Sequence, residues 1–266
     1  VAMPYLKAGY QVFILHYSVK EHSQWPNPLE DYEQAMTLIR KNAGVWNLYP
    51  DKVAVLGFSA GGHLAGCAAT MAKEKPNAAL LGYAVTKEDD VQMCEPQAPD
   101  VNKAVDASTC PCFVFATCND QLVPIENSLK FLQALAEHSV TFESHIYAYG
   151  PHGFSTADSS VQFRESEMCS RISEWVEDSI GWLRDMFGDF GDEEMTEPAC
   201  RAHITGDYEP MLSTECTFGY LRKHQGAAVV MKPLLKWVEE HTEEIISNVR
   251  LIPEEIAEQQ GVEAFY

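Results

Sequence analysis

Three residues have the types and the order that activate a serine nucleophile: Ser59, Asp120 and His152. A serine hydroxyl is a poor nucleophile near neutral pH, so a histidine must take its proton and a carboxylate must orient that histidine and stabilise its charge. Asp120 lies 61 residues after Ser59, and His152 lies 32 residues after Asp120. A βαβ unit takes roughly 30 residues or more. We therefore expect all three side chains at the carboxyl ends of parallel strands, where open α/β sheets place their sites.

The residues around Ser59 predict a sharp turn between a strand and a helix. The sequence Gly57-Phe58-Ser59-Ala60-Gly61 follows an apolar run at 53–56 and precedes a segment of small residues at 63–72. In such a nucleophile elbow only glycine leaves room at positions 57 and 61. The apolar run is typical of a strand buried on both faces of a parallel sheet. The alternative is a tight turn of another α/β fold with an incidental serine.

The elements that must position these residues can be read from the apolar pattern. We predict strands over 11–15, near 80–83, and over 112–116 and 141–148, with helices over 1–10, 63–72, 125–138 and 166–187. Asp120 then follows the strand at 112–116, and His152 follows the strand at 141–148. The last helix carries an apolar stripe that is typical of a core-facing surface and should close the domain.

Three motifs together resemble the esterase/lipase branch of the α/β-hydrolase superfamily, and within it the bacterial acetylxylan-esterase-like carbohydrate esterases. They are the segments Gly57-Phe58-Ser59-Ala60-Gly61-Gly62-His63-Leu64-Ala65, Asn119-Asp120-Gln121-Leu122-Val123-Pro124 and His152-Gly153-Phe154. The order Ser, Asp, His is that of the superfamily. The resemblance covers roughly residues 1–187. It implies that Ser59 is the nucleophile, His152 the general base and acid, and Asp120 its orienting carboxylate.

The reaction also needs hydrogen-bond donors for the negative oxygen of the tetrahedral intermediate. The backbone N–H of Ala60 is the first candidate, because the first N–H groups of a helix have no partner within it. A Gly-rich loop before the strand at 11–15 should supply the second donor, and the sequence holds none. Since the chain begins at Val1, we expect a fragment that lacks its first strands and this loop, and is less active than the full-length parent.

Further residues could border the site. His16 and Tyr17 follow the strand at 11–15, and His63 lies on the first turn of the helix after Ser59. All three are candidate pocket residues, but for His63 a local structural role is the simpler interpretation. Other acidic residues between 86 and 109 fall in an irregular segment, where solvated loop positions are the simpler interpretation, and His145 falls inside a strand.

Composition limits the partners and the chemistry. The chain has 266 residues, is 46% hydrophobic, and carries a net charge of −20. Such a surface repels phosphate backbones, so we expect neither nucleic acid nor a membrane as a partner. The eight cysteines show no metal-ligand spacing. We therefore expect no metal and no cofactor, and favour a cytoplasmic setting over a secreted one.

A change in composition marks a second region. We predict an α/β-hydrolase domain over residues 1–187, with a mostly parallel sheet and helices on both faces. Residues 188–266 should hold an acidic linker and a small C-terminal helical module, for which packing or assembly into a homo-oligomer is the simplest role.

The sequence thus predicts a serine hydrolase that cleaves a carboxylic ester through an acyl-Ser59 intermediate. The resemblance implies a short acyl group, such as acetyl, on a sugar or similar alcohol. Two alternatives remain open: a serine peptidase similar to prolyl oligopeptidase, and a binding protein with a catalytically dead hydrolase fold.

Overall fold

The computed structural model describes residues 1–158, 161, 164, 167–189 and 195–203, and single positions between 212 and 236. The chain divides into two compact units, Val1–Ala202 and His203–Tyr266. The helices and strands considered below belong to the first unit. The predicted C-terminal helical module lies almost entirely outside the described residues, and the predicted boundary at 187/188 stays a prediction.

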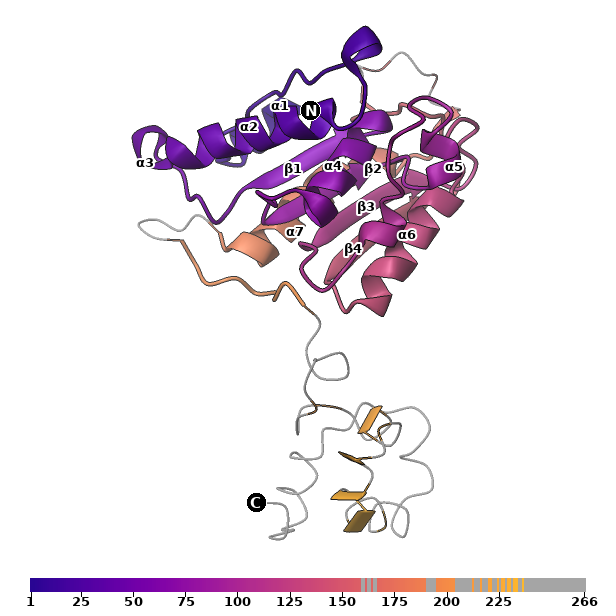
Figure 1. The fold of residues 1–266 in the computed structure, drawn as a ribbon. Coiled ribbons are helices and arrows are strands. Elements are labelled where there is room, and N and C mark those ends of the chain that lie inside the picture. Colours follow the sequence, from indigo (N-terminus) through magenta and orange to yellow (C-terminus); the bar gives the residue numbers. More distant parts are fainter. Residues whose placement is uncertain are drawn as a thin grey trace. The chain divides into compact units, whose positions relative to one another are not determined.

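A four-stranded parallel sheet with the order β1-β2-β3-β4 organises the first unit (Figure 1). The strands are β1 (Ala54–Phe58), β2 (Ala78–Gly82), β3 (Cys112–Thr117) and β4 (Phe142–Tyr147). Every neighbouring pair runs in parallel, so the segments that follow the four strands meet at one edge of the sheet. The predicted parallel sheet is confirmed, as are the strands near 80–83 and over 112–116 and 141–148.

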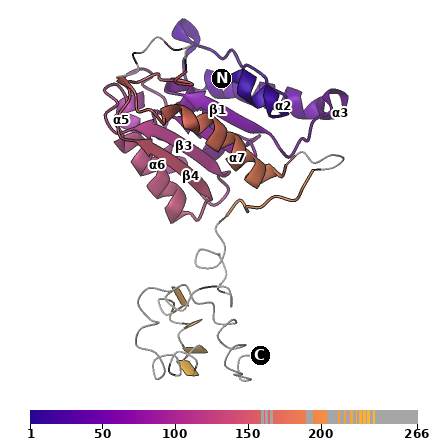
Figure 2. The ribbon, with the colours of Figure 1, turned by 180° about the vertical axis from the view of Figure 1, so that it is seen from behind.

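Helices cover both faces of this sheet. One face carries α2 (Asn27–Lys41), α4 (Ala60–Met71) and α6 (Glu126–Glu137), and the other carries α1 (Ala2–Lys7) and α7 (Trp175–Phe187). Strand β2 shows the physical reason, because alternate side chains of a strand point to opposite faces. Leu81 joins the first core and Leu80 the second, and both are fully buried. Helices α4 and α6 lie in front of the sheet in Figure 1, and α7 lies in front of it in Figure 2, which shows the opposite side.

Short helices complete the unit: η1 (Lys20–His22), α3 (Ala43–Trp46), α5 (Glu88–Val91), η2 (Asn102–Ala104) and η4 (Ile172–Glu174). Among the described residues, no helix is both long and apolar enough to cross a membrane.

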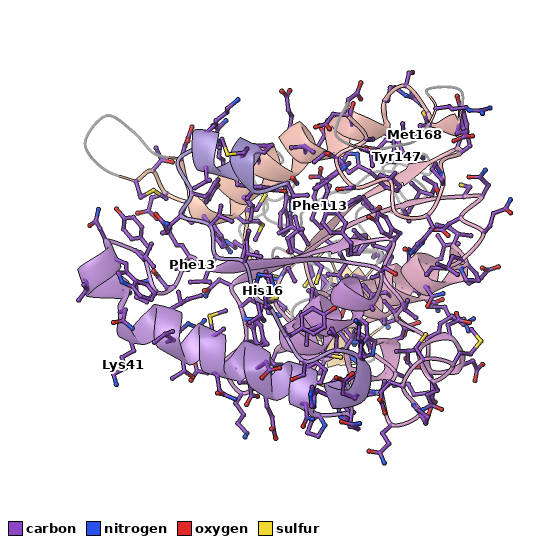
Figure 3. The ribbon with its side chains drawn as sticks, turned by 90° about the horizontal axis from the view of Figure 1, so that it is seen from above. Phe13, His16, Lys41, Phe113, Tyr147 and Met168 are labelled. Carbon is purple, nitrogen blue, oxygen red and sulfur yellow. The ribbon has the colours of Figure 1, made fainter. Side chains whose placement is uncertain are left out.

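The strand predicted over residues 11–15 is not formed. This segment has no regular secondary structure, and Ile14 is 74% exposed. Phe13 packs against Trp46 of α3, with ring centroids 5.4 Å apart; Figure 3 labels Phe13 and His16 on this segment. A strand requires a neighbouring backbone that supplies hydrogen bonds, and none of the four described strands pairs with these residues. The apolar composition of residues 11–15 favours an extended backbone, but it does not show whether a neighbouring strand is present to pair with it.

Two further expectations need correction. Strand β1 pairs only with β2 and is an edge of the described sheet, so Ala54 is exposed and Leu56 only half-buried instead of covered on both faces. The helix predicted over 166–187 begins as α7 at Trp175, after η4; residue 166 itself is outside the described part. The backbone N–H of Cys169 donates to the carbonyl oxygen of Tyr149 at 3.2 Å. This hydrogen bond holds the segment before α7 against the turn that follows β4.

Candidate active site

Ser59 lies on a one-residue turn between β1, which ends at Phe58, and α4, which begins at Ala60. Its backbone has φ 54° and ψ −119°, in the region that non-glycine residues rarely adopt. A Cβ added to Gly57 would lie 2.0 Å from the carbonyl oxygen of Gly61. The sequence therefore forms the elbow because residue 57 has no side chain to block the approach of helix to strand.

Gly61, contrary to expectation, is not in a crowded position. A Cβ there would meet only the hydroxyl oxygen of Tyr17, at 3.6 Å, which is an ordinary contact. The crowded position is Gly62, where an added Cβ would lie 2.5 Å from the Cβ of Ala84. The pattern around the serine indicated where the turn is, but the helix orientation decides which glycine faces a neighbouring backbone.

The structure brings Ser59, His152 and Asp120 into one chain of hydrogen bonds. His152 Nδ1 lies 2.7 Å from Asp120 Oδ2, and His152 Nε2 lies 2.9 Å from Ser59 Oγ. These distances fit an imidazole whose Nδ1–H donates to the carboxylate while its Nε2 accepts from the serine hydroxyl. The His152 side chain is 17% exposed, so it can reach a substrate, whereas the Asp120 side chain is 1% exposed.

The surroundings of Asp120 keep it ionised. Burial by itself would raise the pKa of its carboxyl group, but hydrogen bonds from His152 and from the backbone N–H groups of Val123 and Leu122 outweigh that effect and lower the pKa. Both backbone N–H groups donate to Oδ1 at 2.9 Å. One carboxylate oxygen is thus held by the turn after β3, and the other faces His152.

The loop that carries His152 is attached to the end of β3. The hydroxyl of Thr117 donates to the carbonyl oxygen of Gly150 at 2.9 Å, and Asn119 Oδ1 accepts the backbone N–H of Gly150 at 2.9 Å. The backbone N–H and the carbonyl oxygen of Gly150 are therefore both hydrogen-bonded to residues of the segment that leads into Asp120. We call Thr117, Asn119 and Gly150 the loop clamp, because it fixes the histidine loop relative to the aspartate.

Ala60 provides the N–H that was expected to face a developing oxyanion. It is the first residue of α4, so the helix itself offers this N–H no acceptor. Negative charge is favoured at a helix N-terminus. Ala60 also adjoins Ser59 in the chain, and its role as an oxyanion donor stays a prediction.

The three predicted pocket residues lie in different environments. Tyr17 is half-buried, with its hydroxyl oxygen beside Gly61 of the elbow, and burial raises its pKa. His16 is exposed on the segment before η1. His63 is buried under the loop after α5: its Nε2 lies 3.0 Å from the carbonyl oxygen of Pro99, and its ring packs edge-on to Trp25. These contacts fit the local structural role that the sequence favours for His63, here between α4 and that loop.

The other acidic and histidine candidates have partners elsewhere. Asp90 Oδ2 accepts a hydrogen bond from Asn127, and Asp106 Oδ1 accepts from Ser108. His145 lies on β4, where its Nε2 is 2.8 Å from Glu143 Oε1. Among the described residues, no group of three or more His, Cys, Asp or Glu side chains could hold a metal ion.

Tyr83, which no sequence motif marks as a site residue, lies against His152 in the structure. The two rings cross at 70° with centroids 4.9 Å apart. Tyr83 directly follows β2, so the available signal was its position at the same sheet edge as the other site residues.

Comparison with known proteins agrees with this fold. The family BD-FAE matches residues 1–76. The solved structure of an α/β-hydrolase enzyme from a Medee basin deep-sea metagenome library is 37% identical, with a TM-score of 0.64 over 70% of this chain and 75% of that one. The chain belongs to the α/β-hydrolase superfamily.

Two curated relatives are similar to this chain over part of their length. The chain is 32% identical over 190 residues to endo-1,4-beta-xylanase B of Butyrivibrio fibrisolvens, covering 59% of this chain and 29% of that protein. It is 30% identical over 169 residues to an acetylxylan esterase of Xylanibacter ruminicola, covering 56% and 35%. The chain thus spans about a third of the length of these two relatives.

Proposed function

We propose that this chain is a serine hydrolase that cleaves carboxylic esters. The observation that carries the proposal is the continuous hydrogen-bonded chain from Ser59 Oγ through His152 to Asp120 at the elbow before α4. A serine in this setting can be deprotonated as it attacks, because the imidazole receives its proton and the carboxylate stabilises the resulting imidazolium.

In the first half of the proposed reaction, Ser59 Oγ attacks the carbonyl carbon of the ester while its proton passes to His152 Nε2. The carbonyl oxygen becomes an oxyanion, and the Ala60 N–H donates to it. As the tetrahedral intermediate collapses, His152 returns the proton to the leaving oxygen. An alcohol departs, and the acyl group remains on Ser59.

The second half uses the same groups on water. His152 Nε2 takes a proton from a water molecule as that water attacks the acyl carbon. The second tetrahedral intermediate then breaks its bond to Ser59 Oγ, which recovers the proton from His152. A carboxylic acid is released, and the ionised Asp120 holds the imidazole in the same tautomer throughout.

The substrate part of the proposal is a short acyl ester, such as acetate, on a sugar or similar alcohol. Its support is the similarity to the Xylanibacter ruminicola acetylxylan esterase. The net charge of −20 also disfavours strongly anionic substrates.

A fluorophosphonate probe tests the mechanism without knowledge of the substrate. We expect a single adduct, mapped by mass spectrometry to Ser59, and expect Ser59→Ala and His152→Ala to abolish it. A folded wild-type chain that is not labelled would overturn the proposal in favour of a binding protein.

A substrate panel then tests the bond that is cleaved. We expect hydrolysis of p-nitrophenyl acetate to exceed that of the butyrate and octanoate esters. Faster cleavage of an aminoacyl amide than of any ester would instead favour a peptidase.

A further inference from the structure

The backbone around Tyr83 is bonded to two of the three catalytic segments. On one side, the Ser59 N–H donates to the carbonyl oxygen of Gly82 at 3.0 Å, and the Val85 N–H donates to the carbonyl oxygen of Ser59 at 3.3 Å. On the other side, the Tyr83 N–H donates to the carbonyl oxygen of Phe115 at 2.7 Å. Tyr83 is therefore held between the elbow and β3, the strand that leads to Asp120.

The side chain of Tyr83 meets the third segment, the histidine loop. Its ring lies 4.9 Å from the His152 ring and 4.7 Å from the Phe154 ring, measured between centroids. Its hydroxyl oxygen accepts the backbone N–H of Ser155 at 3.3 Å. The ring also stacks on Phe58, with centroids 5.5 Å apart. Tyr83 thus touches His152, two loop residues that follow it, and the residue that precedes Ser59.

The backbone of Tyr83 adopts a conformation that costs free energy. Its φ is 35°, which is a clear outlier for a bulky L-residue. Such strain persists only where the surrounding structure holds it in place, most often at functional sites. The Tyr83 side chain is 3% exposed and firmly packed, so the strained backbone sets the direction in which the ring points.

We propose that Tyr83 is a positioning residue for His152: its ring fixes the orientation of the imidazole, and its hydroxyl adds only a weaker hold on the backbone of the loop that carries it. This inference rests on the proposed function, because it assigns Tyr83 a role in that reaction. It requires no contact between Tyr83 and the substrate. The ring restricts the imidazole to the plane in which Nδ1 faces Asp120 and Nε2 faces Ser59.

The test compares two substitutions at Tyr83 with one at a buried tyrosine far from the site. Tyr83→Leu removes the aromatic face, and Tyr83→Phe removes only the hydroxyl. Tyr32→Leu is the matched control, because Tyr32 is equally buried but lies on α2, where its hydroxyl donates to the carbonyl oxygen of Glu74. All variants are made in the full chain, and folding is checked by circular dichroism and urea unfolding.

Two readouts separate positioning from stability. The first is the rate of fluorophosphonate labelling of Ser59, together with kcat and KM for p-nitrophenyl acetate. We expect Tyr83→Leu to lower the labelling rate and kcat about 10- to 100-fold with little change in KM, since a misplacement of about 1 Å costs that much. We expect Tyr83→Phe to retain most of the rate and Tyr32→Leu to react like wild type once the folded fraction is taken into account.

The second readout is the low-field proton NMR signal of the His152 Nδ1–H, which is assigned by its loss in His152→Ala and does not depend on turnover. We expect it in wild type and in Tyr32→Leu, and expect it broadened or lost in folded Tyr83→Leu. An unchanged signal together with an unchanged labelling rate in Tyr83→Leu would overturn the inference. If wild type is not labelled by the probe but the NMR signal depends on Tyr83, the proposed function fails while the positioning contact stands.

Discussion

The carbonyl oxygen of Gly61 occupies the space that a side chain on Gly57 would need. A Cβ on residue 57 would lie only 2.0 Å from that oxygen, while a Cβ on residue 61 would meet nothing closer than 3.6 Å. The two glycines of the elbow are therefore not equivalent. One permits the turn that exposes Ser59, and the other lies on the open side of α4.

This asymmetry makes the two Gly→Ala variants a matched pair. We expect Gly57→Ala to force β1 and α4 apart, lowering the free energy of unfolding by several kcal/mol and abolishing probe labelling of Ser59. We expect Gly61→Ala to fold and react, and to gain up to about 1 kcal/mol because alanine is the better helix former. Urea unfolding and labelling rates check both. Equal effects of the two substitutions would contradict the geometry.

The second prediction concerns the carboxylate beside His152. Asp120→Asn keeps the size of the side chain but removes the charge that stabilises the imidazolium and selects its tautomer. Serine hydrolases with this change lose about 10⁴-fold in turnover, and we expect a loss of that order in the labelling rate. Asp178→Asn is the control, because Asp178 pairs with His145, 3.5 Å away, outside the site. A similar loss in both variants would mean that the carboxylate of Asp120 acts through the overall negative charge of the protein and not through its contact with His152.

The loop clamp gives the third prediction. Thr117→Val leaves the carbonyl oxygen of Gly150 without its donor, and we expect about 1–3 kcal/mol less stability together with slower labelling. Thr70→Val is the comparison, since the buried Thr70 hydroxyl donates to the carbonyl oxygen of Gly66 within α4. We expect that variant to lose stability but not its labelling rate per folded molecule. The role assigned to the clamp does not stand if Thr117→Val reacts at the wild-type rate.

The fourth prediction is a pH dependence of stability at His63. Burial lowers the pKa of its imidazole below the ordinary value of 6.5, against smaller opposing effects of the Pro99 carbonyl and Asp100. The unfolded chain then binds this proton more readily than the folded one. The free energy of unfolding therefore falls as the pH drops from about 6.5, the pKa in the unfolded chain, to the lower pKa in the folded chain. For one proton this loss is at most about 1.4 kcal/mol per pH unit.

His63→Gln removes the titrating group, and its amide nitrogen can still donate to the Pro99 carbonyl oxygen. We expect the free energy of unfolding of wild type, measured in urea between pH 7.5 and 5, to fall more steeply than that of His63→Gln. Parallel pH curves for the two proteins would show that His63 is not protonated on unfolding in this range.

Much of this protein is determined by local sequence. An apolar run of strand length predicted β3, an alternating pattern predicted β4, and small residues after Ser59 predicted α4, because these signals reside in neighbouring residues. The order and spacing of Ser59, Asp120 and His152 predicted their meeting at one edge, since parallel strands separated by helices place their carboxyl ends together.

The tertiary structure decided what depends on partners that are distant in the chain. Residues 11–15 have the composition of a strand but no described neighbour to pair with, and His63 is placed under the loop at Pro99. Which glycine of the elbow is crowded depends on how α4 is oriented over β2. The contact between Tyr83 and His152, 69 residues apart in the chain, forms only when β2, β3 and β4 lie side by side. Hydrogen bonds and packing between separate elements produce no periodic pattern in the sequence, and they determine how the side chains of this site are arranged.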